Sequence, residues 1–260
     1  MSYVSVAGVA KTFRRGGTST HALAAVDLEL RQGEFAAVVG PSGCGKSTLL
    51  RIIAGLLPAT AGSVRFNGGH VDRPQTNLGV VFQSPVLLES RTVLDNVLVQ
   101  LELRGLEKRH FREKALALLA RVGLADFADR YPRELSGGMR QRTAIVRALI
   151  HDPPFLLMDE PFGALDALTR EQMRLDLEAL WMETGKTVLF ITHSIDEAVL
   201  LADRVIVMSE RPGRVEREVP IPLPRPRGLA ARKAGEFIAA TSAITEIFLA
   251  RGILHQEVQA

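Results

Sequence analysis

One stretch of the sequence combines residue types and spacing suited to holding a polyphosphate. After an apolar run, Glu34–Val39, and before a helical pattern starting near Lys46, it reads Gly40-Pro41-Ser42-Gly43-Cys44-Gly45-Lys46-Ser47-Thr48. Glycines let the backbone curl so that its N–H groups face phosphate oxygens, and the following helix adds the positive end of its dipole. Lys46 would then place its ammonium on the β- and γ-phosphates, and Ser47 would offer a hydroxyl to Mg²⁺. The stretch therefore predicts a phosphate loop that binds a nucleotide.

The phosphate loop contains Cys44, the single cysteine of the chain. One interpretation is a small side chain that the loop tolerates. The other is a reactive thiol, since a helix N-terminus lowers the pKa of a nearby cysteine, and its alkylation would then block nucleotide entry. A single cysteine excludes an internal disulfide and fits a reducing compartment.

Two adjacent acids follow a second apolar run. Phe155–Met158 reads as a buried strand, and Asp159 and Glu160 come directly after it. Asp159 at a strand end can reach the Mg²⁺ held by Ser47, because Mg²⁺ is bound through few direct carboxylates. Glu160, one residue further, could orient or deprotonate the attacking water. Two acids after a strand can also form a solvated turn, and the phosphate loop upstream favours the functional interpretation.

A second helix start also suits an anion. Ser136 reads as the N-cap of a helix that runs to Leu149, and Gly137 and Gly138 expose the first unpaired N–H groups. An ordinary capped helix requires the serine but not both glycines. Because the chain has one phosphate loop, we expect this helix start to serve the γ-phosphate held by another copy of the protein.

The elements that must position these residues alternate between strand and helix. Strand patterns occur at Tyr3–Val9, Ala25–Leu30, Glu34–Val39, Ser63–Phe66, Leu78–Phe82, Phe155–Met158, Thr187–Thr192 and Val205–Met208. Helical patterns occur at about Lys46–Ala54, Asp166–Glu183 and Ile195–Leu201, and a 3.6-residue period continues from Thr92 to Ile150. Strands separated by helices predict a mainly parallel sheet covered on both faces, with the helical stretch as an insertion.

Composition narrows the class of protein. The chain has 260 residues, 47% of them hydrophobic, which is enough for a sizeable core and excludes a disordered or collagen-like polymer. A formal net charge of +3 is too weak a bias to indicate nucleic acid as a partner. We expect no secretory signal at the N-terminus and no spanning helix, because charged residues interrupt every apolar run.

The order of the motifs resembles a known family. A phosphate loop, then Leu135-Ser136-Gly137-Gly138-Met139-Arg140-Gln141-Arg142, then an apolar strand ending in Asp159-Glu160, is similar to the ATP-binding subunit of ABC transporters. The resemblance spans residues 3–218. It implies a RecA-like P-loop NTPase core with an antiparallel β edge and an inserted α-helical subdomain. The expected domain covers residues 1–220, with the insertion at about 85–150, and a Pro-rich connector and C-terminal helix occupy 221–260.

The same resemblance gives roles to further residues. Phe13 matches the aromatic that stacks on adenine, Gln83 the glutamine that contacts the metal, and His193 the histidine that contacts the γ-phosphate. Asp166, in Ala164-Leu165-Asp166, matches the D-loop of the family, which implies a place at the nucleotide. Outside the resemblance, Phe13 could be a core residue, Gln83 a strand cap and His193 a structural side chain.

The resemblance further implies a mechanism and partners. Two copies would hold two ATP molecules, each with Mg²⁺, between Gly40–Thr48 of one copy and Ser136–Gly138 of the other. Lys46, Gln83, Glu160 and His193 would carry catalysis. The apolar loop Pro85–Leu88 resembles the docking site for a helix of a membrane permease, and its alternative is a buried hinge. The implied location is the cytoplasmic face of the inner membrane, as a peripheral subunit, with a secreted solute-binding protein as an indirect partner.

Softer features resemble one importer group. Arg211-Pro212-Gly213-Arg214 and Pro224–Arg227 are typical of nitrate, sulfonate and taurine importers and of their thiamine-precursor relatives. Glu89-Ser90 departs from the Pro-Trp of many relatives, which leaves the permease and the substrate open. The alternatives are an exporter subunit and a soluble ABC-type ATPase acting on nucleic acid or ribosomes. Against the latter, the chain has neither a long coiled-coil insertion nor a second nucleotide unit.

Overall fold

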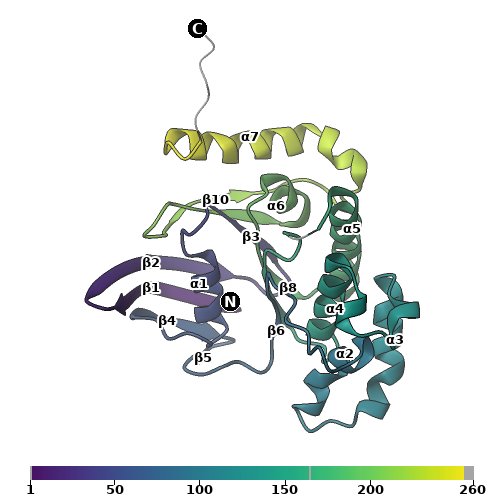
Figure 1. Cartoon of the computed structure of the whole chain (residues 1–260). Coiled ribbons are helices and arrows are strands. Elements are labelled where there is room, and N and C mark those ends of the chain that lie inside the picture. The colour runs from purple at the N-terminus through teal and green to yellow at the C-terminus, as the bar shows by residue number, and fades with distance from the viewer. Residues whose placement is uncertain (1, 164, 255–260) are drawn as a thin grey trace. The chain divides into compact units, whose positions relative to one another are not determined.

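A computed structural model describes residues 2–163 and 165–254 (Figure 1). The chain divides into two compact units, the first made of Met1–Thr76 with Thr187–Ala260 and the second of Asn77–Lys186. Among the described residues, no helix combines the length and apolar character needed to cross a bilayer.

The first unit contains an antiparallel sheet in the strand order β2-β1-β4-β5. Gly16 and Gly17 both have positive φ and form the turn that joins its two longest strands. Near its end, the second strand alternates buried and exposed residues, as expected for a sheet with one face on the core. The strands are β1 (Val4–Arg15), β2 (Thr18–Leu30), β4 (Ala61–Phe66) and β5 (Gly69–His70).

The first unit also contains parallel strands. β3 (Phe35–Val39) pairs in parallel with both β8 (Thr187–Ile191) and β9 (Arg204–Met208), and β10 (Val215–Pro220) adds an antiparallel edge to β9. Every residue of β3 and β8 is buried, which matches their continuous apolar sequences and is typical of parallel strands covered on both faces.

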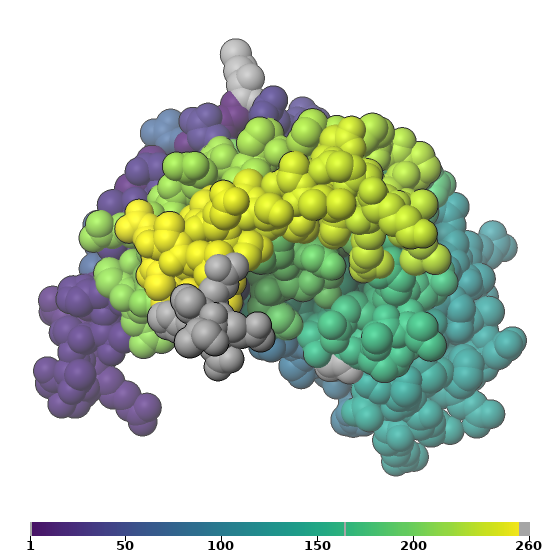
Figure 2. All heavy atoms as spheres, turned by 90° about the horizontal axis from the view of Figure 1, so that it is seen from above, coloured from purple at the N-terminus to yellow at the C-terminus, as the bar shows by residue number. Residues whose placement is uncertain are grey.

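Helices of the first unit are α1 (Lys46–Ile53), α6 (Ile195–Leu201), the 3₁₀ helix η4 (Leu229–Lys233) and α7 (Gly235–Ala250). Figure 2 shows α7, in yellow, lying along the surface of this unit. The helix buries Phe237, Ala240, Ile244 and Phe248, a spacing of three or four residues that defines one apolar face.

The Pro-rich segment 221–228 has neither helix nor strand, and its two arginines anchor it to α6. Arg225 donates to the carbonyl oxygen of Leu201 at 2.5 Å, and Arg227 donates to those of Val199 and Ala202 at 2.8 and 2.7 Å. The last carbonyl oxygens of a helix have no hydrogen-bond donors within it. The two guanidiniums supply such donors at the C-terminus of α6.

The second unit combines two parallel strands with a largely helical segment. β6 (Gly79–Val81) and β7 (Phe155–Asp159) pair in parallel register, with Val81 opposite Met158. The helices are α2 (Val93–Glu102), α3 (Arg112–Arg121), α4 (Gly137–Leu149) and α5 (Ala167–Thr184), with short 3₁₀ helices at Lys108–Phe111, Ala125–Phe127 and Pro132–Glu134.

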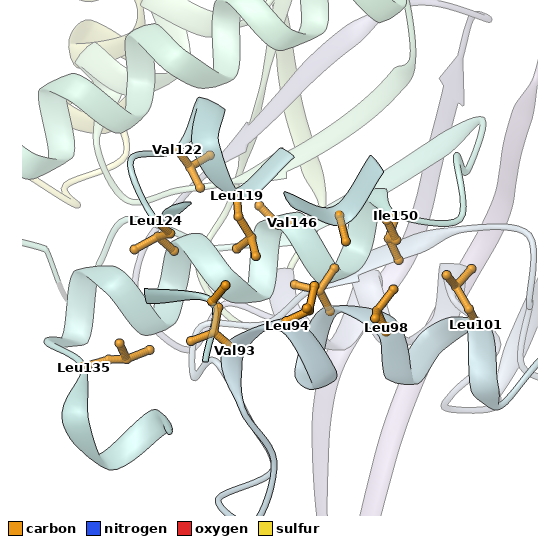
Figure 3. Close-up of a cluster of buried hydrophobic side chains, with 13 residues drawn as sticks. Val93, Leu94, Leu98, Leu101, Leu119, Val122, Leu124, Leu135, Val146 and Ile150 are labelled. Carbon is orange, nitrogen blue, oxygen red and sulfur yellow. The ribbon is translucent and has the colours of Figure 1, made fainter. Parts of the chain in front are cut away.

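The helical segment of the second unit has a core of its own (Figure 3). Residues at i, i+3, i+4 and i+7 of α2 face buried residues of α3 and α4, and the cluster includes Val93, Leu94, Val97, Leu98, Leu101, Ala115, Leu119, Val146 and Ile150. Thr92 caps α2 by accepting from the N–H of Asp95 at 3.1 Å. The apolar period read over Thr92–Ile150 therefore corresponds to packed helices.

The expected strands and helices are present, and two elements extend beyond their sequence patterns. β1 and β2 continue outward to the turn at Gly16, and the strands β5 and β10 have no counterpart in the patterns. The final helix expected from about Leu229 to Ala250 is interrupted at Ala234, which separates η4 from α7. The parallel strands, the antiparallel edge and the helical segment confirm the predicted fold class.

Candidate functional site

The predicted site residues are divided between the two units. Phe13, Gly40–Thr48 and His193 belong to the first, and Gln83, Ser136–Gly138, Asp159, Glu160 and Asp166 to the second. Ala164 lies outside the described residues.

The phosphate loop of the first unit follows β3 and leads into α1, as the sequence predicts. Gly45 has φ 113°, and a Cβ there would lie 2.6 Å from Leu23 Cδ2 and 2.8 Å from the Ala22 carbonyl oxygen. Both the left-handed backbone and the close neighbours require glycine at this position. The loop is therefore a preformed backbone turn, and the cradle that its glycines create fits a polyphosphate.

Lys46 is held inside the phosphate loop. Its side chain is buried, and Nζ donates to the carbonyl oxygens of Gly40 and Pro41 at 2.8 and 2.9 Å. An ammonium has three donors and binds as a compact point charge, so it can exchange carbonyl partners for phosphate oxygens. Lys46 Nζ therefore lies among the carbonyl oxygens of the loop.

Cys44 has two interpretations from the sequence, and its burial favours one of them. The thiol is buried, with 1% of the residue exposed, and burial raises its pKa although the Lys46 charge acts in the opposite direction. The reactive-thiol interpretation requires a lowered thiol pKa and does not fit this direction, because the cost of removing a thiolate from water exceeds the attraction of the nearby cation. The structure supports the interpretation of Cys44 as a small packed side chain.

His193 lies at the same sheet edge as the phosphate loop. β3 and β8 are parallel neighbours, with Val38 opposite Ile191, and the loop and His193 follow their respective carboxyl ends. The turn after β8 is fixed because Thr192 Oγ1 donates to Glu197 Oε2 at 2.5 Å and accepts from the Ser194 N–H at 3.0 Å. The His193 side chain is exposed at this turn.

Phe13 lies near the outer end of β1 and is 42% exposed. Lys11 places its ammonium 5.3 Å from the ring centroid. An aromatic face in solvent suits stacking on a planar base, and the core alternative for Phe13 is excluded by its exposure.

The acids of the second unit follow β7. Asp159 is buried at the end of the strand, and Glu160 has φ 45°, a left-handed conformation that costs a non-glycine residue about 1–3 kcal/mol. The turn is closed by a hydrogen bond from the Gly163 N–H to the Glu160 carbonyl oxygen at 3.1 Å. This local backbone strain turns Glu160 away from the direction of the strand that holds Asp159.

Gln83 contacts Glu160 directly. Its Nε2 donates to Glu160 Oε2 at 3.1 Å, and the parallel pairing of β6 with β7 brings the two residues to one sheet edge. The amide therefore fixes the orientation of the carboxylate proposed to act on water. The strand-cap alternative for Gln83 does not account for this bond.

Ser136 is the N-cap of α4 and accepts from the Met139 N–H at 3.3 Å. Ser136 and Gly137 are exposed, so the N-terminus of the helix is accessible. A Cβ on Gly138 would lie 3.1 Å from Thr169 Cγ2 and 3.3 Å from Leu165 Cδ2, which explains the second glycine by close packing.

Asp166 is the N-cap of α5. Its carboxylate accepts from the Thr169 N–H at 3.0 Å, and that bond holds the pKa of Asp166 below its usual range. These contacts give Asp166 a local structural role at the start of α5.

The loop Pro85–Leu88 is exposed, with Val86 at 63% and Leu88 at 43%. Arg147 donates to the carbonyl oxygens of Pro85 and Val86 at 2.7 Å each, and Asn96 holds both the N–H and the carbonyl of Leu88. The backbone of this loop is fixed while the side chains of Val86 and Leu88 face solvent, which does not fit the buried-hinge alternative.

Comparison with known proteins gives the family of this chain. The ABC transporter family matches residues 23–163. This chain belongs to the ABC transporter family. An ABC transporter ATP-binding protein of Methanocaldococcus jannaschii, itself uncharacterized, is 50% identical over 224 residues, which are 86% of this chain and 84% of that one. The taurine import ATP-binding protein TauB of Rhizobium johnstonii is 52% identical over 201 residues, 77% of each chain.

Solved structures place this ABC protein among the P-loop NTPases. The dimeric post-hydrolysis state of an ATP-binding cassette bound to ADP and Pi is 37% identical, with a TM-score of 0.76 over 84% of this chain and 98% of that one. A second dimeric structure of a bacterial ABC transporter cassette has a TM-score of 0.77 with the same identity and coverage.

Sequence reasoning did not assign three residues that support the ABC motifs. Arg147 and Asn96 hold the loop Pro85–Leu88, and Gln141 donates to the Phe82 carbonyl oxygen at 3.2 Å, which ties α4 to the segment that carries Gln83. Gln141 and Asn96 are buried polar residues inside apolar helical patterns. Such positions are a sequence signal for a required hydrogen bond.

Proposed function

We propose that the chain is the ATP-binding and ATP-hydrolysing subunit of a solute importer of the taurine, nitrate and sulfonate type. The observation that carries the proposal is the similarity to taurine import ATP-binding proteins of several bacteria, at 47–52% identity over more than three quarters of each chain. Thiamine-precursor importers are the second candidate substrate class, because Arg211–Arg214 and Pro224–Arg227 also resemble the corresponding stretches of that group.

The proposed chemistry assigns each residue one task. The N–H groups of Gly40–Thr48 and the ammonium of Lys46 bind the nucleotide phosphates, and Phe13 stacks on the base. Ser47, Gln83 and Asp159 offer a hydroxyl, an amide oxygen and a carboxylate, which are the hard oxygen donors that Mg²⁺ prefers. Bound Mg²⁺ would neutralise charge on the phosphates.

Turnover is assigned to Glu160 and His193. Glu160 accepts the proton of the attacking water while Gln83 holds its carboxylate, and His193 contacts the γ-phosphate from its turn after β8. Ser136, Gly137 and Gly138 of a second copy complete the phosphate contacts, so nucleotide joins two copies. The dimeric cassettes among the similar structures support this arrangement. Asp166 is assigned to the same dimer face.

The exposed loop Pro85–Leu88 supplies the proposed contact with a membrane permease. Apolar side chains on a fixed backbone suit a groove that accepts a helix of the partner. The subunit would then act peripherally at the cytoplasmic face of the inner membrane, with a secreted binding protein delivering the solute.

Replacing Glu160 by glutamine tests the assignment. Glu160→Gln removes the base but keeps size and polarity, so we expect ATP binding and nucleotide-dependent dimerisation to persist while phosphate release falls at least about 100-fold. Glu113→Gln, an exposed change in the same unit, serves as the matched control and keeps full turnover. Rapid hydrolysis by Glu160→Gln would remove Glu160 from its role.

Co-purification separates the candidate functions. The full chain, expressed in its native host and extracted in detergent, should bring down an integral membrane protein. Recovery of nucleic acid or ribosomes in its place would favour the soluble ATPase. Uptake of labelled solute into vesicles that contain the complex distinguishes import from export.

A further inference from the structure

The loop between β9 and β10 packs against the phosphate loop. The Gly213 N–H donates to the Ala22 carbonyl oxygen at 2.9 Å, and the Gly213 carbonyl accepts from the Ala24 N–H at 3.0 Å. A Cβ on Gly213 would lie 2.1 Å from the Cys44 carbonyl oxygen, so only glycine permits this approach. Backbone contacts thus fix the segment Ser209–Arg214 beside the phosphate loop.

Arg211 extends from this segment to the phosphate loop. Its Nε and Nη2 donate to one acceptor, the Gly43 carbonyl oxygen, at 3.1 and 2.9 Å. Gly43 has φ 74°, and a Cβ there would lie 3.1 Å from Nη2, so the glycine also makes room for the guanidinium. A guanidinium carries five N–H donors, and these two bonds use two of them.

The phosphate loop is therefore held by two cations. Lys46 binds the carbonyl oxygens of Gly40 and Pro41 from its own helix, and Arg211 binds that of Gly43 from a segment 168 residues further along the chain. Carbonyl oxygens repel phosphate, whereas N–H groups attract it. A guanidinium that donates hydrogen bonds to a loop carbonyl oxygen orients that peptide group and adds positive charge beside the loop.

We propose that Arg211 is a positioning residue for nucleotide binding, which fixes the Gly43 peptide and strengthens the affinity of the loop for nucleoside polyphosphates. This inference rests on the proposed function, because it names a determinant of affinity at the same loop. The competing explanation is that Arg211 only ties the Ser209–Arg214 segment to its unit. That explanation predicts a change in thermal stability without a change in affinity.

The test is a titration of the full chain with MgADP, which binds the loop without turnover. We expect Arg211→Ala to raise the Kd about tenfold, as for loss of a charge-assisted bond. Arg211→Lys, which keeps the charge but loses the planar fork, should lie between the wild type and Arg211→Gln. Arg214→Ala removes one positive charge from the same exposed loop and should leave the Kd within about twofold of the wild type.

The dependence of the Kd on salt concentration is a second measurement, and a purely structural role of Arg211 would leave it unchanged. The Kd of the wild type should rise more steeply with NaCl than that of Arg211→Ala, because one cation near the phosphates is lost. Equal affinity and equal salt slopes in all variants would overturn the proposal. If Arg211→Ala does not fold, the comparison of Arg211→Lys with Arg211→Gln decides the question. Failure of the wild type itself to bind MgADP would instead refute the proposed function.

Discussion

Arg227 offers a quantitative test of how the Pro-rich segment 221–228 supports α6 and the turn that carries His193. The residue is 2% exposed, and its guanidinium donates to the carbonyl oxygens of Val199 and Ala202, at the end of α6, and of Leu223. α6 begins at Ile195, two residues after His193. Arg227→Met keeps the length of the side chain and removes all of these donors.

The expected cost follows from two opposing effects. Each buried carbonyl left without a donor costs about 1–3 kcal/mol, so the three that lie within 3.0 Å of the guanidinium nitrogens cost roughly 3–9 kcal/mol, and Ile221, whose carbonyl oxygen is 3.4 Å away, adds little. Removing a buried cation returns part of its desolvation cost, several kcal/mol per ion. The negative end of the α6 dipole already stabilises the charge, which limits that return. We expect the free energy of unfolding to fall by about 3 kcal/mol.

Urea unfolding monitored by circular dichroism measures the change, and hydrogen exchange of peptides that cover α6 locates it. Arg232→Met is the matched control, because Arg232 is more exposed and lies 3.9 Å from Asp196. Its cost should stay below about 0.5 kcal/mol. A loss of less than about 1 kcal/mol in Arg227→Met, with unchanged exchange in α6, would refute the reasoning.

Two further predictions concern titrating groups. Because burial raises the pKa of Cys44, iodoacetamide should modify this single thiol more slowly than an exposed cysteine at pH 7.5. The modification should become faster as the pH rises past 9. Rapid labelling of the native protein at pH 7 would contradict this prediction. Burial, with the charge of Arg104, lowers the pKa of His151 to about 4, so the unfolded state binds the proton first as the pH falls from 6.5 to 4. The free energy of unfolding should decrease over that window, and less so in His151→Gln; equal slopes for the two proteins, measured by urea midpoints, would show that His151 does not carry the effect.

The sequence predicts those features that depend on neighbouring residues. Phe35–Val39 and Phe155–Met158 are continuous apolar runs, and the phosphate loop lies in a strand–turn–helix context that local patterns define. The sequence identifies Ser136 as an N-cap, because a serine directly before a helical pattern commonly accepts a hydrogen bond from an N–H group of the first turn. In each case the physical cause lies within a few residues of the position.

Features that depend on distant partners could not be predicted. The acceptors of Arg227 lie 25 and 28 residues earlier, and the acceptor of Arg211 lies 168 residues earlier. The pKa of Cys44 depends on burial by the surrounding fold as well as on the adjacent helix, and the fold has the larger effect. The left-handed backbone of Glu160 carries no residue-type signal, since glycine is the usual marker of such a turn.

Helix α4 forms a rigid connection between Ser136 and the exposed loop Pro85–Leu88. Ser136 caps its first turn, and Arg147, near its last turn, holds the backbone of the exposed loop at Pro85 and Val86. Thirteen residues at 1.5 Å each make a rod about 20 Å long, too short and too well packed to bend appreciably. A displacement of the loop Pro85–Leu88 at one end of α4 would therefore move Ser136 at the other end by a comparable distance.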